Sequence, residues 1–168
     1  ALAPGQAAIV LAQIAVPAGT MSGTVGQVGV TAVSQANAAI QAEVLDEIIV
    51  TQVRELAVSA GYTQIAQTGS TITYTHLITN LGNYTDTFAV IVNGSPGWKI
   101  SYPPTVTIAG GSSMPIAFVL QIPANTCEQK HTMTITIAIP DLPGMQAVAV
   151  NVTTINASCV YLPAVLNP

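Results

Sequence analysis

The feature that most constrains this chain is an internal repeat that covers only part of its length. Residues 2–18 align with residues 108–124 at a constant spacing of 106, ending in a shared Pro-Ala dipeptide. The match continues, with a one-residue slip, to about residue 50. Residues 51–106 have no counterpart upstream, so the first 50 residues repeat only the second half of the region 51–156.

Apolar and polar residues alternate with a period of two along most of the chain, and turn residues interrupt the pattern about every ten residues. This pattern predicts an all-β protein, an antiparallel β-sandwich with one complete domain and one half-domain. In the first half-domain we expect strands at 9–16, 25–33 and 40–50. The strands expected after residue 51 are 53–58, 71–80, 85–92, 98–102, 113–122, 131–139 and 145–155.

The repeat and the strand pattern together predict three parts. Residues 51–156 form a complete two-layer sandwich, residues 1–50 form the closing strands of another, and residues 157–168 form an apolar tail. A half sandwich leaves an apolar face and unpaired strand edges in water, and each large side chain left uncovered forfeits about 1.5–3 kcal/mol of burial. We therefore expect the half-domain to be covered by upstream chain or, through strand addition, by another subunit.

Assembly contacts are expected on the two incomplete parts of the chain. The one-residue slip sets Val28 and Val30 over Ile135 and Ile137, which are expected core positions of the complete domain. The expected assembly residues are Ile9, Leu11, Val28 and Val30 in the half-domain and Tyr161, Leu162 and Val165 in the tail.

The charge content excludes several classes of function. Only 6% of the residues are charged and the formal net charge is −4, so the chain lacks the basic surface that nucleic acid requires. No uninterrupted apolar stretch reaches the roughly 20 residues of a membrane-spanning helix. The surface is solvated mainly by hydroxyl and amide side chains, which carry no charge. Copies of such a chain repel one another weakly, and this favours ordered association into a fibre or layer.

Cysteines and glycosylation motifs point to an exported protein, extracellular or on the cell surface. Cys127 and Cys159 are the two cysteines, and they fit one disulfide in an oxidising compartment better than a metal site. Four N-x-[ST] motifs are candidate glycan acceptors. They begin at Asn83, Asn93, Asn151 and Asn156.

No residue pattern indicates catalysis or a bound cofactor. The two histidines lack partners at suggestive spacing: we expect His76 to be a half-exposed structural residue and His131 to lie on a solvated turn. Calcium would have only Asp86 or Asp141 with backbone carbonyls, fewer carboxylates than such a cation usually takes. The sequence therefore predicts no enzyme, no cofactor and no metal.

One run of residues resembles a known family. Tyr74, Asn80, Gly82, Asn83, Asp86 and Phe88 spell Y-x5-N-x-G-N-x2-D-x-F, followed by Gly97-Trp98. The run resembles the Ig-like domains repeated in prokaryotic surface proteins, including those appended to alpha-galactosidases. This resemblance implies an Ig-like sandwich over residues 51–156. The tail from Cys159 to Leu166 is similar to the Tyr-Leu-Pro-rich endings of exported proteins from filamentous green bacteria.

Two functions are compatible with this sequence. The first is a structural subunit of an extracellular filament, sheath or surface appendage, whose partners are copies of itself or other surface proteins. The second is an accessory spacer or carbohydrate-binding Ig-like module cut from a larger secreted hydrolase or surface protein. The charge-poor surface and the uncovered half-domain favour the first.

Overall fold

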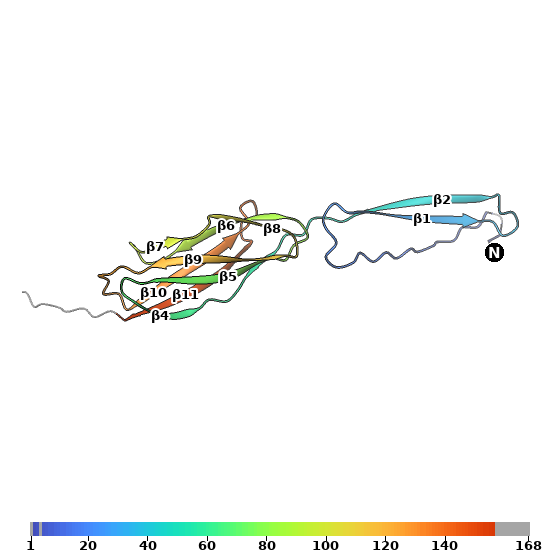
Figure 1. Ribbon diagram of the computed structural model, residues 1–168. Coiled ribbons are helices and arrows are strands. Elements are labelled where there is room, and N and C mark those ends of the chain that lie inside the picture. The colour runs from blue at the N-terminus through green and yellow to red at the C-terminus, as the bar shows by residue number, and fades with distance from the viewer. Residues whose placement is uncertain (1, 4, 157–168) are drawn as a thin grey trace, which may run out of the picture. The chain divides into compact units, whose positions relative to one another are not determined.

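The computed structural model describes residues 2–3 and 5–156 and divides the chain after Thr51 into two compact units. We call them unit 1 and unit 2. Every regular element in the described part of the chain is a β-strand, as the alternating pattern predicts (Figure 1).

Unit 2 is a β-sandwich of two sheets. The five-stranded sheet has the order β4-β11-β10-β6-β8 and the four-stranded sheet has the order β3-β5-β9-β7. Their strands are β3 (Leu56–Val58), β4 (Thr63–Gln67), β5 (Thr71–Asn80), β6 (Asp86–Asn93), β7 (Lys99–Ser101), β8 (Thr105–Ile108), β9 (Ser113–Gln121), β10 (Lys130–Ala138) and β11 (Gln146–Asn156).

The core lies between the two sheets. Alternate residues of each strand point inward, and the fully buried side chains include Phe88, Phe118, Ile135 and Ile137. Most neighbouring strands are antiparallel, but β4 runs parallel to β11. The five-stranded sheet is therefore mixed, which departs from the wholly antiparallel arrangement expected.

The parallel pair arises where the chain changes sheets. β3 pairs with β5 in one sheet, and a few residues later β4 joins β11 in the other. Gly61 lies in this crossing, where an added Cβ would collide with the Val150 carbonyl oxygen. A glycine is needed because the two backbones approach too closely for a side chain.

Unit 1 contains one antiparallel hairpin, formed by β1 (Val25–Val33) and β2 (Gln41–Ile49). These are two of the three strands expected. The third, at residues 9–16, is wrong, because this segment has no strand structure. A strand needs a neighbour to accept and donate its backbone hydrogen bonds, and within unit 1 none is paired with this segment.

The hairpins of the two units have the same register. β10 and β11 begin 105 residues after β1 and β2, and the loops between them, 34–40 and 139–145, have equal length. Each hairpin forms nine aligned residue pairs. This register aligns Val28 and Val30 with Met133 and Ile135, which corrects the sequence alignment by two residues and leaves both valines on the same face.

Candidate assembly surface

The face of the hairpin that corresponds to the sandwich interior has no cover in unit 1. We call it the inner face; its residues are Gly26, Val28, Val30 and Ala32 on β1 and Ala42, Val44, Asp46 and Ile48 on β2. No described residue of unit 1 is buried. Val44 is 61% exposed, whereas Ala149, at the same register position in β11, is 3% exposed. The inner face is therefore an interior surface that lacks an opposing sheet.

The N-terminal segment covers only one end of the inner face. Ile14 and Val16 line a shallow apolar pocket of about 160 Å³ together with Ile48 and Val50. Their repeat counterparts make a similar contact in unit 2, where Ile122 packs on Ile155. Further upstream the segment is solvated: of the expected assembly residues, Ile9 is 99% and Leu11 is 91% exposed.

Asp46 is the one charged residue of the inner face. It occupies the register position of Asn151, which is fully buried in β11. The Asn151 amide oxygen accepts a hydrogen bond from the Tyr62 backbone at 2.8 Å, and its amide nitrogen lies 2.9 Å from His76 Nε2. A carboxylate buried at this position requires a cationic or hydrogen-bond-donating partner, because an unpaired charge is costly away from water.

Unit 2 exposes a second charge-poor surface, the side of the five-stranded sheet that points away from the core. We call it the outer face. Ile65, Ile91, Val148 and Val150 are between 45% and 72% exposed there. Threonines separate them across the sheet: Thr136 lies between Val148 and Ile91, and Thr134 between Val150 and Asn93. Among the residues of these five strands that point outward, Lys130 is the one that carries a charge.

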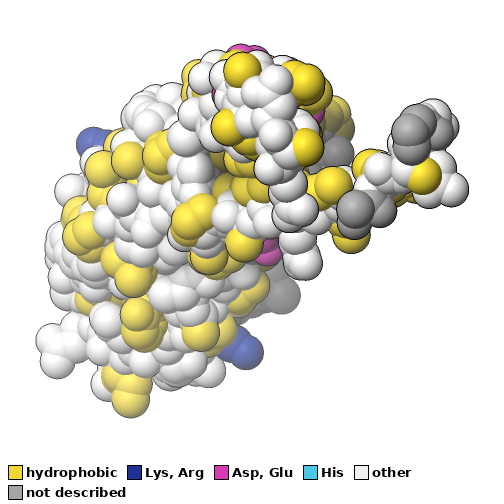
Figure 2. Space-filling view, turned by 90° about the vertical axis from the view of Figure 1, so that its right-hand side faces the viewer, with side chains coloured by type: hydrophobic (Ala, Val, Ile, Leu, Met, Phe, Trp, Pro, Cys, Tyr) yellow, Lys and Arg dark blue, Asp and Glu magenta, His cyan; other side chains and the backbone are white. Residues whose placement is uncertain are grey.

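A low density of charge is also visible on the face of the molecule drawn in Figure 2. Figure 2 shows hydrophobic side chains scattered among uncharged ones, with few charged groups on the visible face. Because the inner face and the outer face each carry a single charged residue, little charge repulsion opposes their association.

The four candidate glycan acceptors differ in accessibility. Asn93 and Asn156 are exposed, and Asn83 is half-buried with its side-chain oxygen accepting from the Val53 backbone at 2.8 Å. Asn151 is fully buried and hydrogen-bonded, which leaves no room for a glycan in the folded domain. Glycosylation of the other three stays a prediction.

The remaining expected contacts lie in the tail. Cys159, Tyr161, Leu162 and Val165 fall outside the described residues. The disulfide with Cys127 and the assembly role of the tail therefore stay predictions.

Both histidines are fully buried, which corrects the expectation of a half-exposed and a solvated residue. His76 lies 3.1 Å from the Ser59 hydroxyl on one side and contacts Asn151 on the other. His131 stacks on Trp98 with ring centroids 4.1 Å apart, and among the described residues its Nε2 has no hydrogen-bond partner. Burial lowers the pKa of His131, while the nearby Glu128 opposes this shift. Alternation alone could have placed both side chains inside.

The two calcium candidates are held by an arginine. Arg54 makes ion pairs of 2.6 Å with both Asp86 and Asp141. These interactions hold the pKa of Asp141 below its usual range. Within the described residues there is no group of three or more His, Cys, Asp or Glu side chains that could hold a metal ion.

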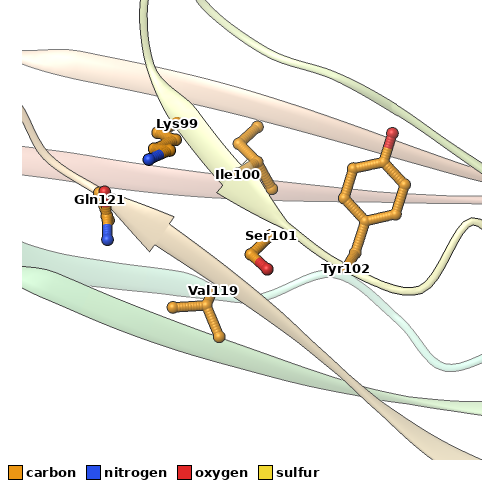
Figure 3. Close-up of a pocket in the computed structure, with 6 residues that line it drawn as sticks. All are labelled: Lys99, Ile100, Ser101, Tyr102, Val119 and Gln121. Atoms are coloured by element: carbon orange, nitrogen blue, oxygen red, sulfur yellow. The ribbon is translucent and has the colours of Figure 1, made fainter.

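A groove of about 410 Å³ runs beside β7, the edge strand of the four-stranded sheet (Figure 3). Lys99, Ser101 and Gln121 line it, with Tyr102 at one end. Sugar-binding sandwiches present exposed aromatic rings, but Tyr102 is half-buried and its ring lies 6.1 Å from that of Phe118. The groove therefore offers little for stacking a sugar.

No family model and no curated protein matches the chain. Solved structures with some likeness include Escherichia coli alpha-2-macroglobulin activated by porcine elastase, at 18% identity and a TM-score of 0.45, covering 68% of this chain and 10% of that one. The secreted serine protease VesC from Vibrio cholerae has 16% identity and a TM-score of 0.46, with coverage of 60% and 23%. The PapD-like domain 7 of human CEP192 has 7% identity and a TM-score of 0.42, with coverage of 64% and 87%.

The chain spans less than a quarter of the first two of these proteins. Such distant similarities assign no function. No helix in the described part of the chain is long and apolar enough to cross a membrane.

Proposed function

We propose that this protein is a structural subunit of an extracellular filament, sheath or surface appendage, in which a neighbouring subunit covers the inner face of unit 1. One observation carries the proposal: β1 and β2 reproduce the register of the buried β10–β11 hairpin, yet no described residue of unit 1 is buried. An interior face without an opposing layer gains stability when another surface covers it.

The composition supports the same role. Few surface charges oppose contact between copies, and an even number of cysteines suits an oxidising compartment. The protein acts by assembly and carries out no catalysis in this proposal. Both histidines serve the packing of unit 2, because their rings are buried among Ser59, Asn151 and Trp98.

Sedimentation velocity over a concentration series tests the proposal, with electron microscopy of the heaviest fraction. We expect a shift from monomer to large species or filaments as concentration rises. A chain that stays monomeric over the whole series, with unit 1 uncovered, would contradict the proposal.

The second candidate is an accessory spacer or binding module of a larger secreted protein. The register-matched repeat favours it, because tandem modules of one polypeptide also produce such repeats. The intact mass of native material separates the two: a polypeptide much heavier than 17.2 kDa favours the module.

A further inference from the structure

The strands that complete unit 2 are a poor cover for unit 1 of another copy. Residues 52–106 already pack on β9, β10 and β11 of their own chain. Moreover, the repeat places Ala12 where Phe118 fills the core and Gly26 where His131 stacks on Trp98. Exchange would therefore leave large cavities, and another surface must cover the inner face.

We propose that the inner face of unit 1 docks on the outer face of the five-stranded sheet of a second copy, with Asp46 against Lys130. This inference rests on the proposed function and names the covering surface. It is a sheet-on-sheet contact, in which two β-layers pack about 10 Å apart.

Opposite charge and exposed aliphatic side chains together favour this pair of faces. Asp46 is the one charged residue of the inner face, and Lys130 is the one charged outward residue of the five strands. Of the other two cations in the sequence, Arg54 is engaged by two carboxylates. Lys99 is the one outward charge of the four-stranded sheet, but that sheet exposes one large aliphatic side chain outward, Leu77, against four on the outer face. A single pair of opposite charges on otherwise uncharged faces fixes register and orientation.

The apolar residues have matching distances from the two charges. On β2, Val44 and Ala42 lie two and four residues from Asp46. On the outer face, Thr132 and Thr134 lie two and four residues from Lys130, and Val150 is the cross-strand neighbour of Thr134. At about 3.3 Å per residue, Ala42 lies roughly 13 Å from Asp46, and Thr134 with its neighbour Val150 lies roughly 13 Å from Lys130.

A shallow part of the inner face matches a protruding residue of the outer face. Ala32 and Ala42 pair four residues from Asp46, at the distance at which Val150 stands out from the outer face, whereas Gly26 lies in the pocket lined by Ile14 and Val16. The two faces belong to different units, so each copy offers one of each kind. A contact between unlike surfaces repeats head to tail, and it builds an open chain of subunits when the rotation between copies does not close a ring.

Charge exchange on the full-length protein tests this contact. Lys130→Glu and Asp46→Lys should each raise the concentration for half-assembly at least about tenfold, because they place like charges in the contact. The double variant should restore assembly to near the wild-type concentration. Lys99→Glu and Glu43→Lys are the matched controls, on the other sheet and on the opposite side of the hairpin, and should leave assembly unchanged.

A carbodiimide crosslink provides a second readout that does not depend on variants. Assembled protein should yield an amide between the Asp46 carboxyl and the Lys130 amine of another copy, identified by mass spectrometry of the digested product. Two results would overturn the inference while the proposed function stands. The first is a crosslink from Asp46 to Lys99 in place of Lys130, and the second is assembly that the charge variants leave unchanged. A wild-type chain that never assembles would remove both.

Discussion

The β1–β2 and β10–β11 hairpins have the same register around equal loops, yet one is exposed and the other forms half of a core. The difference lies in what surrounds them. β10 pairs with β6 and β11 with β4, and both face the four-stranded sheet, whereas β1 and β2 pair only with each other. A two-stranded hairpin is marginal in water by itself, so the comparison shows that the hairpin pattern needs a cover to become a stable layer.

The largest expected difference between the hairpins comes from truncating one aligned pair of core positions. Ile135→Ala should lower the free energy of unfolding of unit 2 by about 2–5 kcal/mol, because Ile135 is fully buried. The counterpart, Val30→Ala, should change it by less than about 0.5 kcal/mol in the unassembled protein. Urea denaturation followed by Trp98 fluorescence measures unit 2, and far-UV circular dichroism in the same titration, which also reports the strands of unit 1, measures the effect of Val30→Ala. Equal losses from the two variants would mean that unit 1 has a core of its own.

The aligned polar positions sharpen the comparison. Asn151→Asp gives β11 the carboxylate that β2 carries as Asp46, and it replaces the amide nitrogen next to His76 with an acceptor. We expect a loss of about 1–3 kcal/mol in the stability of unit 2. Asp46→Asn should leave the stability of the monomer unchanged, because water solvates that position. A neutral outcome for Asn151→Asp in the same denaturation assay would show that the two environments are equivalent.

Arg54 lies in the part of unit 2 that has no counterpart in unit 1, and its ion pairs with Asp86 and Asp141 can be tested by substitution. Arg54→Met should destabilise unit 2 by about 1–3 kcal/mol, since it leaves the buried Asp86 carboxylate without its ion pair. The matched control is Lys99→Met, at an exposed position of β7, which should have no measurable effect. A thermal melt with no difference between the two variants would assign the Arg54 cluster no structural role.

A pH dependence should be confined to unit 2, because both histidines lie there. Burial lowers the pKa of His131, so the folded state favours the neutral ring. The neutral His131 ring therefore contributes its full stabilisation at pH values above the unfolded pKa of about 6.5. This stabilisation is lost as the pH falls toward the folded pKa, by at most about 1.4 kcal/mol per pH unit. Denaturation midpoints at several pH values between about 5 and 8 measure this. His131→Phe keeps an aromatic ring beside Trp98 and should flatten the profile; an unchanged slope would assign the effect to another group.

The sequence predicted the fold class. Alternation predicted most strands of unit 2, because their interior positions are apolar and β-branched, but it missed the short strands β4 and β8. The strand predicted at residues 9–16 is absent. Alternation shows that a segment could lie in a sheet, but a strand forms only where a neighbouring strand is available to pair with it.

The site was only partly predictable. Val28 and Val30 were predicted as assembly residues, and that role stays a prediction; their register was displaced because the alignment did not take the equal loop lengths into account. Lys130 was not singled out, because its isolation on the outer face depends on which strands are neighbours in the sheet. Burial of His76 and His131 was missed, although both occupy inward positions of the alternating pattern in their strands.

Hydrogen exchange of β1 and β2, measured on dilute monomer and on assembled protein, tests the central claim most directly. The account predicts that these amides exchange within seconds to minutes in the monomer and become at least about a hundredfold slower in the assembly, while β10 and β11 are protected in both. Amides of β1 and β2 that exchange equally fast in both states would contradict it, because the hairpin would then remain uncovered when the subunits associate.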